Sequence, residues 1–318
     1  MTRIARRPTC GRIVAVLMTF VCSAAVFRVG PAVAAAPPVT APTTVPAIKG
    51  VKIYYDVPYT RSGDVRQRLD IYVPENAARP LPVMVWVHGG GWNAGSKETG
   101  RGPVLLALEN GCAAVSINYR FTRQAIHPAQ IEDCKTAIRF LRAHAGEYGL
   151  DPQRIAAWGA SAGGHLVSLL ATLDEQTYRT DEYADQSSRV CGVISLCGPV
   201  NFFPLDDNPH AAEPVRGLLG GKAAEKPDVA RAASPLTYIS ADDPPVWLIH
   251  AVGDPVVPHA QSVEFEAALK KAGVKVTRID LPGESHGISM QNPLVRGATA
   301  QFIKTVLRGD EAAAPQQR

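Results

Sequence analysis

The chain alternates between two hydrophobic periods for most of its length, and this alternation limits the folds open to it. Short apolar runs rich in Val and Ile have the length of strands, and between several of them apolar residues recur every three or four positions, as on one face of a helix. Strands that alternate with helices predict a mostly parallel sheet covered by helices on both faces. The predicted strands are 51–56, 68–73, 83–88, 112–118, 154–158, 190–197, 245–251 and 274–281.

Three segments have the clearest helical patterns. Residues 128–150 place their apolar side chains on one face, and Gly149 is positioned to end the helix. Residues 263–273 end at Gly273 in the same way, and a last helix follows near the C-terminus. The apolar faces of the first and last helices are formed by Ile131, Cys134, Ile138, Leu141, Ala145 and Tyr148, and by Val295, Ala298, Phe302 and Val306.

The N-terminal 36 residues have the pattern of an export signal. A basic stretch leads into the apolar run 13–27, and small residues follow, so we expect cleavage after Ala34, Ala35 or Ala36. The run is shorter than the about 20 residues that span a bilayer, so we expect a protein that is secreted or held in the cell envelope, without stable membrane insertion. The pair Arg6-Arg7 leaves the general and twin-arginine export routes both open.

The remaining chain divides simply. Prolines and threonines make residues 37–50 an extended linker, residues 51–308 are expected to form one domain, and residues 309–318 a disordered tail. The chain of 318 residues has a net charge of +4, but five of its 33 basic residues lie in the export signal, which has no acidic residue. The mature part then carries 28 basic and 29 acidic residues, which argues against a nucleic-acid partner. Nothing in the pattern indicates an oligomeric state.

A serine stands where a predicted strand turns into a predicted helix. Residues 159–163 read Gly-Ala-Ser-Ala-Gly after the strand 154–158, and leucines then continue at helical spacing. In this setting the two glycines let strand and helix pack closely, while the serine is held in a strained conformation with its hydroxyl exposed. We therefore predict that Ser161 is a nucleophile.

A serine nucleophile needs a base, and the base needs an acid that fixes its tautomer. Ligands gather at the carboxyl ends of parallel strands, and two later strand ends supply both groups: Asp254 follows 245–251 and His286 follows 274–281. Asp280 is a weaker candidate because it alternates within its strand. A plain Gly-Asp-Pro turn is the structural alternative for Asp254.

Three consecutive glycines follow the apolar strand 83–88. Acyl transfer builds negative charge on a carbonyl oxygen, and backbone N–H groups aimed at that oxygen stabilise it where no side chain blocks the approach. We predict the amides of Gly90, Gly91 and Ala162 as an oxyanion hole. Trp92 is expected to form a wall of the substrate site, and His88 to brace the loop.

The other histidines and the cysteines are predicted to have structural roles. His165, His250 and His259 are expected to be supports, and no group of His, Cys or acidic residues has the spacing of metal ligands. Four cysteines lie outside the export signal, and an exported protein permits disulfides in three alternative pairings. Cys191 and Cys197 would be about 20 Å apart in an extended strand, beyond the limit of about 7 Å for a disulfide. We expect buried free thiols at Cys112, Cys134, Cys191 and Cys197.

Taken together, HGGGW at 88–92, GASAGG at 159–164, HAVGD at 250–254 and SHG at 285–287 resemble the α/β-hydrolase superfamily. They are most similar to its bacterial esterase and lipase branch with an HGGG loop, which includes carboxylesterases and acetyl-xylan and feruloyl esterase-like proteins. The resemblance covers about residues 50 to 308. It implies an eight-stranded α/β-hydrolase fold, a catalytic triad of Ser161, Asp254 and His286, an acyl-enzyme intermediate, and no cofactor or metal.

Residues 199–240 are too long for a simple crossover, and in similar hydrolases this insertion forms a small cap over the active site. Phe202, Phe203 and Leu205 are candidates for lining the substrate pocket opposite Trp92; ordinary cap core is the alternative. A small cap favours short acyl groups on bulky or polymeric alcohols.

We therefore expect a secreted serine ester hydrolase that acts on a small-molecule or polysaccharide-linked ester. An acyltransferase, or an amidase or peptidase with the same triad, is the alternative, because water and other acceptors compete for the same acyl-enzyme. A binding module on an inactive hydrolase fold is disfavoured, since every catalytic position is filled.

Overall fold

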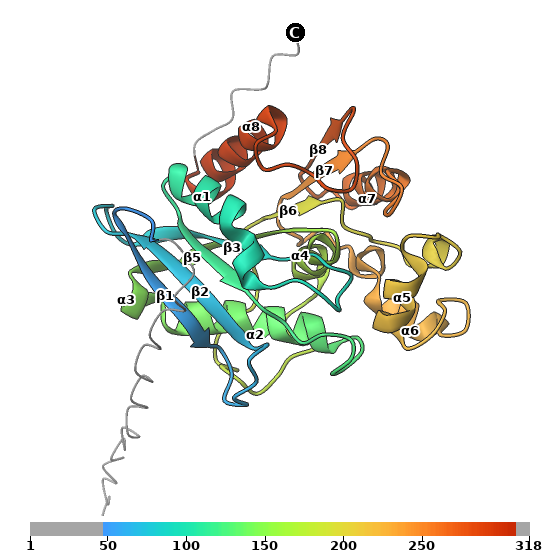
Figure 1. Cartoon of the computed structure of the whole chain (residues 1–318), viewed down its shortest axis with the longest axis horizontal. Helices are drawn as coiled ribbons and strands as arrows, with labels where there is room; N and C mark the ends of the chain where they lie inside the picture. The colour runs from blue at the N-terminus through green and yellow to red at the C-terminus, as the bar shows by residue number, and fades with distance from the viewer. Residues whose placement is uncertain (1–46, 310–318) are drawn as a thin grey trace, which may run out of the picture. The chain divides into compact units, whose positions relative to one another are not determined.

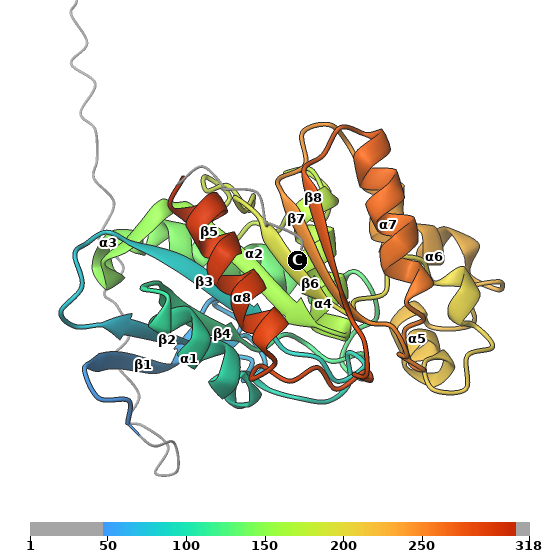
Figure 2. The ribbon, with the colours of Figure 1, turned by 90° about the horizontal axis from the view of Figure 1, so that it is seen from above.

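The computed structural model describes residues 47–309, in which eight strands form one sheet with the order β1-β2-β4-β3-β5-β6-β7-β8 (Figures 1 and 2). β1 pairs antiparallel with β2, and β2 with β4, whereas every other neighbouring pair is parallel. The strands are β1 (Val51–Pro58), β2 (Arg68–Pro74), β3 (Leu81–Val87), β4 (Ala113–Ile117), β5 (Leu150–Ala160), β6 (Val193–Leu196), β7 (Val246–Ala251) and β8 (Val276–Leu281). The predicted mostly parallel, eight-stranded α/β sheet is confirmed. The predicted export signal, most of the linker and nearly all of the tail lie outside the described residues.

Helices cover both faces of the sheet. They are α1 (Arg101–Glu109), α2 (Ala129–Ala143), α3 (Ala145–Tyr148), α4 (Ala162–Thr172), α5 (Ala212–Leu219), α6 (Pro227–Ala233), α7 (Ala260–Lys271) and α8 (Pro293–Phe302). Short turns of helix complete the fold: η1 (Lys97–Gly100), η2 (Phe203–Leu205), η3 (Pro235–Tyr238) and the π-helical turn η4 (Ile303–Leu307). No helix among these described residues has the length and apolar character needed to cross a membrane.

The side chains of β3 show why two helical layers are needed. All seven residues of this central strand are buried. Val83, Val85 and Val87 join the core cluster that includes α2, α4 and α7, whereas Met84 and Trp86 join the opposite cluster with α1 and α8. Because successive strand residues point to opposite faces, a continuous apolar run such as LPVMVWV requires cover on both sides.

The predicted helix over 128–150 is interrupted in the structure. α2 ends at Ala143 because the backbone of His144 leaves the helical region, and α3 adds one further turn. Gly149 then adopts the left-handed conformation at φ +68°, as expected for a glycine that ends a helix. All six apolar residues predicted on this face are buried.

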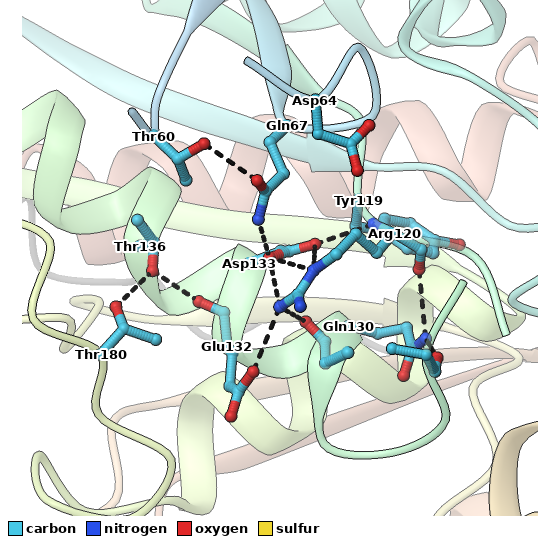
Figure 3. Close-up of polar contacts among 12 residues, drawn as sticks. Thr60, Asp64, Gln67, Tyr119, Arg120, Gln130, Glu132, Asp133, Thr136 and Thr180 are labelled. Atoms are coloured by element: carbon cyan, nitrogen blue, oxygen red, sulfur yellow. Dashed lines mark hydrogen bonds and ion pairs between the residues drawn. The ribbon is translucent and has the colours of Figure 1, made fainter. Parts of the chain in front are cut away.

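A buried polar network ties α2 to the segment after β4 and the segment before β2 (Figure 3). Asp133 of α2 accepts hydrogen bonds from the backbone N–H of Arg120 at 2.8 Å and from its Nε at 2.9 and 3.0 Å. Gln67, just before β2, donates from Nε2 to the same carboxylate at 2.6 Å, and Arg120 also reaches Glu132 at 3.1 Å. This network joins the segment before β2, the segment after β4, and α2.

The four cysteines are free, as predicted, with Cys112, Cys134 and Cys197 buried and Cys191 partly buried. Burial raises the pKa of Cys112 and of Cys197 to about 12, so both thiols stay protonated at neutral pH.

Candidate active site

Ser161 lies at the sharp corner between β5 and α4. Its backbone has φ 55° and ψ −120°, a conformation that L-residues rarely adopt. The flanking glycines make the corner possible: a Cβ atom at Gly163 would lie 2.0 Å from the carbonyl oxygen of Val87, and one at Gly159 would lie 2.6 Å from the backbone of Gly163. The Gly-Ala-Ser-Ala-Gly sequence is therefore required by close backbone contact between β3, β5 and α4.

Two hydrogen bonds join Ser161 to the residues after β7 and β8. His286 Nε2 lies 2.8 Å from Ser161 Oγ, and His286 Nδ1 lies 2.8 Å from Asp254 Oδ2. Because an ionised carboxylate only accepts hydrogen bonds, Nδ1 carries the hydrogen, and Nε2 of the neutral ring accepts from the serine hydroxyl. The structure thus brings together the three side chains that sequence order had associated.

Asp254 is held in the ionised form. Burial acts to raise the pKa of Asp254, but hydrogen bonds from His250, His286 and the amide of Val257 hold it well below the usual range of an aspartate. Its Oδ1 accepts from the backbone N–H groups of Val256 at 2.8 Å and Val257 at 2.9 Å. The carboxylate is therefore anchored by its own turn and available to orient His286.

The glycine loop after β3 passes directly against the nucleophile. A Cβ atom at Gly89 would lie 3.3 Å from Cβ of Ser161, and Gly90 and Gly91 have φ of 108° and 58°. Gly90 and Gly91 line the same cavity as Ser161 and His286, and Ala162 is the first residue of α4 after the serine. The three predicted amide donors thus lie on the two segments that flank the serine hydroxyl.

His88 braces this loop from behind, as predicted. Its ring stacks on Tyr119 with centroids 4.4 Å apart, Nδ1 lies 2.7 Å from the carbonyl oxygen of Gly89, and Nε2 lies 3.2 Å from the guanidinium of Arg66. Tyr119 also donates from its hydroxyl to the carbonyl oxygen of His88 at 2.9 Å. Burial lowers the pKa of His88 to about 4, so the ring is neutral at physiological pH.

A cavity of about 330 Å³ opens at Ser161, and the segment 199–240 forms one side of it. In Figures 1 and 2, α5 and α6 of this segment lie together at one end of the molecule's sheet. Pro214 of α5 reaches the glycine loop, because a Cβ atom at Gly91 would lie 3.0 Å from its Cβ. Apart from Ser161 and His286, the polar side chains of the wall are Asn93 and His210; the apolar wall includes Trp92, Pro199, Leu205, Ala211, Pro214, Val215, Val256 and Val257.

The structure places Trp92 in the cavity wall and places the two phenylalanines outside it. Trp92 lines the cavity, is only 3% exposed, and donates from Nε1 to Nδ1 of His165 at 3.2 Å. Phe202 is fully buried behind it, with ring centroids 5.8 Å from Trp92 and 5.1 Å from His165. Phe203 is 40% exposed, and neither phenylalanine is among the described residues of the cavity wall. Phe202 belongs to the cap core, and Phe203 to its surface.

The remaining predicted supports are in place. His165 is buried between the loop and the cap, and its Nε2 donates to the carbonyl oxygen of Ala233 at 2.8 Å. The rejected acid, Asp280, pairs instead with His259, whose Nε2 lies 2.7 Å from Oδ1.

Sequence reasoning did not assign four residues to the site. They are the amides of Val256 and Val257, the ring of His250, and Cys197, whose thiol donates to the carbonyl oxygen of His286 at 3.6 Å. Within the described residues, Cys197, Asp254 and His286 place one possible metal-binding atom each within 4.8 Å of one another. Asp254 and His286 are already joined to each other and to Ser161, an arrangement suited to moving a proton from the serine hydroxyl.

Several esterases are similar to this chain in sequence. Esterase LipQ of Mycobacterium tuberculosis (strain ATCC 25618 / H37Rv) is 30% identical over 261 residues, which are 79% of this chain and 62% of that protein. A probable isoprenylcysteine alpha-carbonyl methylesterase of Arabidopsis thaliana is 30% identical over 280 residues, which are 82% of this chain and 58% of that protein. The chain therefore spans less than two thirds of the length of these curated relatives.

Solved structures of esterases are similar to this chain as well. A truncated carbohydrate esterase from gut microbiota has a TM-score of 0.78 and 29% identity, covering 83% of this chain and 99% of that one. The propionate-bound esterase Est2 of Thermogutta terrifontis has a TM-score of 0.66 and 26% identity, covering 86% and 98%. A family model described as BD-FAE matches residues 69–269. The chain accordingly belongs to the BD-FAE family, in the esterase and lipase branch of the α/β-hydrolases.

Proposed function

We propose that this protein hydrolyses carboxylic esters through a covalent acyl-enzyme. One observation carries the proposal: a hydroxyl, an imidazole and a carboxylate are joined by two hydrogen bonds of 2.8 Å at the wall of a cavity. The names of the relatives, which are esterases and carboxylic ester hydrolases, support the same reaction.

The mechanism follows from the positions of the groups. Ser161 Oγ attacks the ester carbonyl carbon while His286 Nε2 takes its proton, and Asp254 stabilises the imidazolium that forms. The amides of Gly90, Gly91 and Ala162 stabilise the oxyanion, with each donor contributing about 3 kcal/mol to lowering the barrier. His286 then protonates the departing alkoxide, which leaves an acyl group on Ser161. Water, deprotonated by His286, attacks this acyl group and releases the carboxylic acid and the free serine.

The cavity supports a short acyl group. Its volume of about 330 Å³ is at the lower end of small-molecule sites, and its wall is mainly apolar. One structural relative is a carbohydrate esterase by its title, and another holds propionate. The proposed substrates are therefore short acyl esters, including acyl groups on polysaccharide or other cell-wall alcohols.

Replacement of the nucleophile tests this proposal. Ser161→Ala should reduce kcat for p-nitrophenyl acetate by about 10⁵- to 10⁶-fold, with an unchanged circular dichroism spectrum. Ser168→Ala on the same helix is the matched control, because its hydroxyl donates only to the carbonyl oxygen of Gly164 at 2.8 Å, and it should keep wild-type kcat. Turnover by Ser161→Ala at the wild-type rate would refute the assignment.

A substrate panel then defines the activity more closely. Acetyl, butyryl, octanoyl and feruloyl esters should be hydrolysed with a preference for the shorter acyl groups, because the cavity is small. A competing alcohol should take only a minor share of the acyl group. A product that is mainly the new ester would instead identify an acyltransferase.

Export is a separate part of the proposal and rests on the pattern of residues 1–36. Expression of the full chain in a bacterial host should yield activity outside the cytoplasm and a mature N-terminus after Ala34, Ala35 or Ala36. Activity confined to the cytoplasm with an uncleaved N-terminus would contradict it.

A further inference from the structure

A second histidine contacts the far side of the triad carboxylate. His250, near the end of β7, is completely buried. Its Nε2 lies 2.9 Å from the carbonyl oxygen of Val257 and 3.3 Å from Asp254 Oδ2. Its Nδ1 lies 2.5 Å from Ser262 Oγ in α7. The ring therefore spans the space between the strand end, the turn that carries the acid, and the following helix.

The partners of His250 fix which ring nitrogen carries a hydrogen. Carbonyl and carboxylate oxygens accept hydrogen bonds and do not donate them. Nε2 faces two such oxygens, from Val257 and Asp254, so it must carry a hydrogen that is shared between them. The hydroxyl of Ser262 can serve either role at Nδ1, and it holds the ring in this orientation.

This contact completes the shell of donors around Asp254. The carboxylate accepts from the amides of Val256 and Val257 at Oδ1, and from His286 and His250 at Oδ2. A buried carboxylate loses stabilisation from water, so each such donor helps to keep it charged and in one orientation. His286 can orient correctly only if Oδ2 remains in place.

We propose that His250 is a positioning residue of the catalytic triad, which holds the turn 254–257 closed and keeps Oδ2 of Asp254 directed at His286. The inference rests on the proposed hydrolase function. It assigns a role in the active site to the histidine of the HAVGD segment, for which the sequence predicted only a structural role. His250 touches no substrate, and acts only through Asp254.

Two isosteric substitutions separate this role from ordinary core packing. The side-chain amide of Gln reaches the place of Nε2, next to Val257 and Asp254, whereas that of Asn reaches only the place of Nδ1, next to Ser262. His250→Asn should lower kcat by about 10- to 100-fold with little change in KM, and His250→Gln should stay within about threefold of wild type. Loss of packing alone would impair both variants in proportion to their loss of stability.

The serine's reactivity gives a second measurement that needs no ester substrate. The rate of labelling of Ser161 by a fluorophosphonate should fall in His250→Asn and recover in His250→Gln. His127→Asn is the matched control, because His127 is also buried but its Nε2 contacts the hydroxyl of Tyr178 at 3.2 Å. This control should label and turn over as wild type does, and thermal unfolding of all three variants shows whether each is folded.

The outcomes distinguish a failure of the proposed hydrolase function from a failure of the positioning role of His250. If wild-type protein neither labels nor hydrolyses any ester of the panel, the proposed function fails. If wild type is active but His250→Asn labels and turns over at the wild-type rate, the positioning role is wrong while the function stands. Equal losses in His250→Asn and His250→Gln would also overturn it, because the position of the donor would then be irrelevant.

Discussion

Two buried aspartates in this molecule have similar surroundings and different uses. Asp133 and Asp254 are both buried, and each accepts hydrogen bonds from a cationic or imidazole side chain, from at least one backbone amide and from a further side chain. Asp133 meets Arg120 in the network of Figure 3, whereas Asp254 meets His286. Burial raises the pKa of Asp133, whereas hydrogen bonds hold the pKa of Asp254 below its usual range, but these directions alone do not say which site can move a proton.

The two sites differ in the chemistry of the side chain that each aspartate contacts. Burial acts against the charge of Arg120, but its hydrogen bonds and charge interactions with Asp133 raise its pKa further above the usual value, so Arg120 stays protonated at any physiological pH. The imidazole of His286 has a ring nitrogen that can accept a hydrogen bond from the Ser161 hydroxyl 2.8 Å away, which a guanidinium cannot do. The first pair can therefore only hold segments together, and the second can move a proton.

The strongest test of this comparison exchanges each aspartate for asparagine. Asp254→Asn should lower kcat by about 10⁴-fold, because an amide can donate to Nδ1 of His286 and favour the wrong tautomer, while the free energy of unfolding changes little. Asp133→Asn should lower the free energy of unfolding by about 3 kcal/mol, because it removes the buried one of the two carboxylates that pair with Arg120 and leaves only Glu132, and folded molecules should keep wild-type kcat. Urea unfolding and steady-state kinetics measure both quantities.

The reverse pattern would show that the comparison is wrong. A stable, inactive Asp133→Asn variant would mean that the network of Figure 3 positions the active site rather than the fold. An unfolded Asp254→Asn variant would mean that the triad turn contributes mainly to stability.

A third group of buried residues, three histidines, determines how the free energy of unfolding should depend on pH. Burial lowers the pKa of His88 and His127 to about 4 and that of His165 to about 3. In the unfolded chain these rings titrate near pH 6.5, so between about pH 6.5 and 4 the unfolded state binds protons that the folded state does not. The free energy of unfolding should therefore be fully retained above pH 6.5 and fall by a few kcal/mol toward pH 4.5.

Urea unfolding at several pH values measures this loss. His127→Asn removes one of the three buried rings and should show a smaller dependence on pH than wild type. A free energy of unfolding that is constant between pH 7.5 and 5 would contradict the neutral, buried state of these histidines.

The smallest expected effect comes from Arg120→Lys. A lysine keeps the positive charge but loses the fork of N–H groups that contacts Asp133, Glu132 and the carbonyl oxygen of Ala129. The free energy of unfolding should fall by about 1–2 kcal/mol, with unchanged kcat. Thermal unfolding measures it, and a change in kcat of more than about threefold would show that the two aspartate sites are coupled.

The sequence predicted the parts of the site that depend on local pattern or on strand order. Ser161 was recognisable because its corner requires glycines within two residues on either side. Asp254 and His286 followed from the rule that parallel strands end at the same edge of a sheet, and the structure joins them as expected.

Contacts that depend on how distant segments fold back were not predictable in the same way. Asp133 has partners 13 and 66 residues away, and nothing in its own helix marks it as their acceptor. The cap consists of short helical segments, which are too short to show a periodic pattern of inward and outward residues. Its sequence therefore does not tell which of Phe202 and Phe203 faces inward. His250 could have been suspected, because a histidine inside an apolar strand, four residues before a predicted acid, needs buried hydrogen-bond partners.

The contact between Gly91 and Pro214 has a consequence for changing the specificity of this enzyme family. The amide that is proposed to receive the oxyanion and the helix that walls the substrate meet at a tight contact, where a Cβ atom on Gly91 would lie 3.0 Å from Pro214. A cap grafted from a relative would therefore change this contact and shift the loop whose amides stabilise the transition state. Selectivity and turnover number should then change together, and a graft that alters only selectivity will need a proline or a similarly shaped residue at that point of contact.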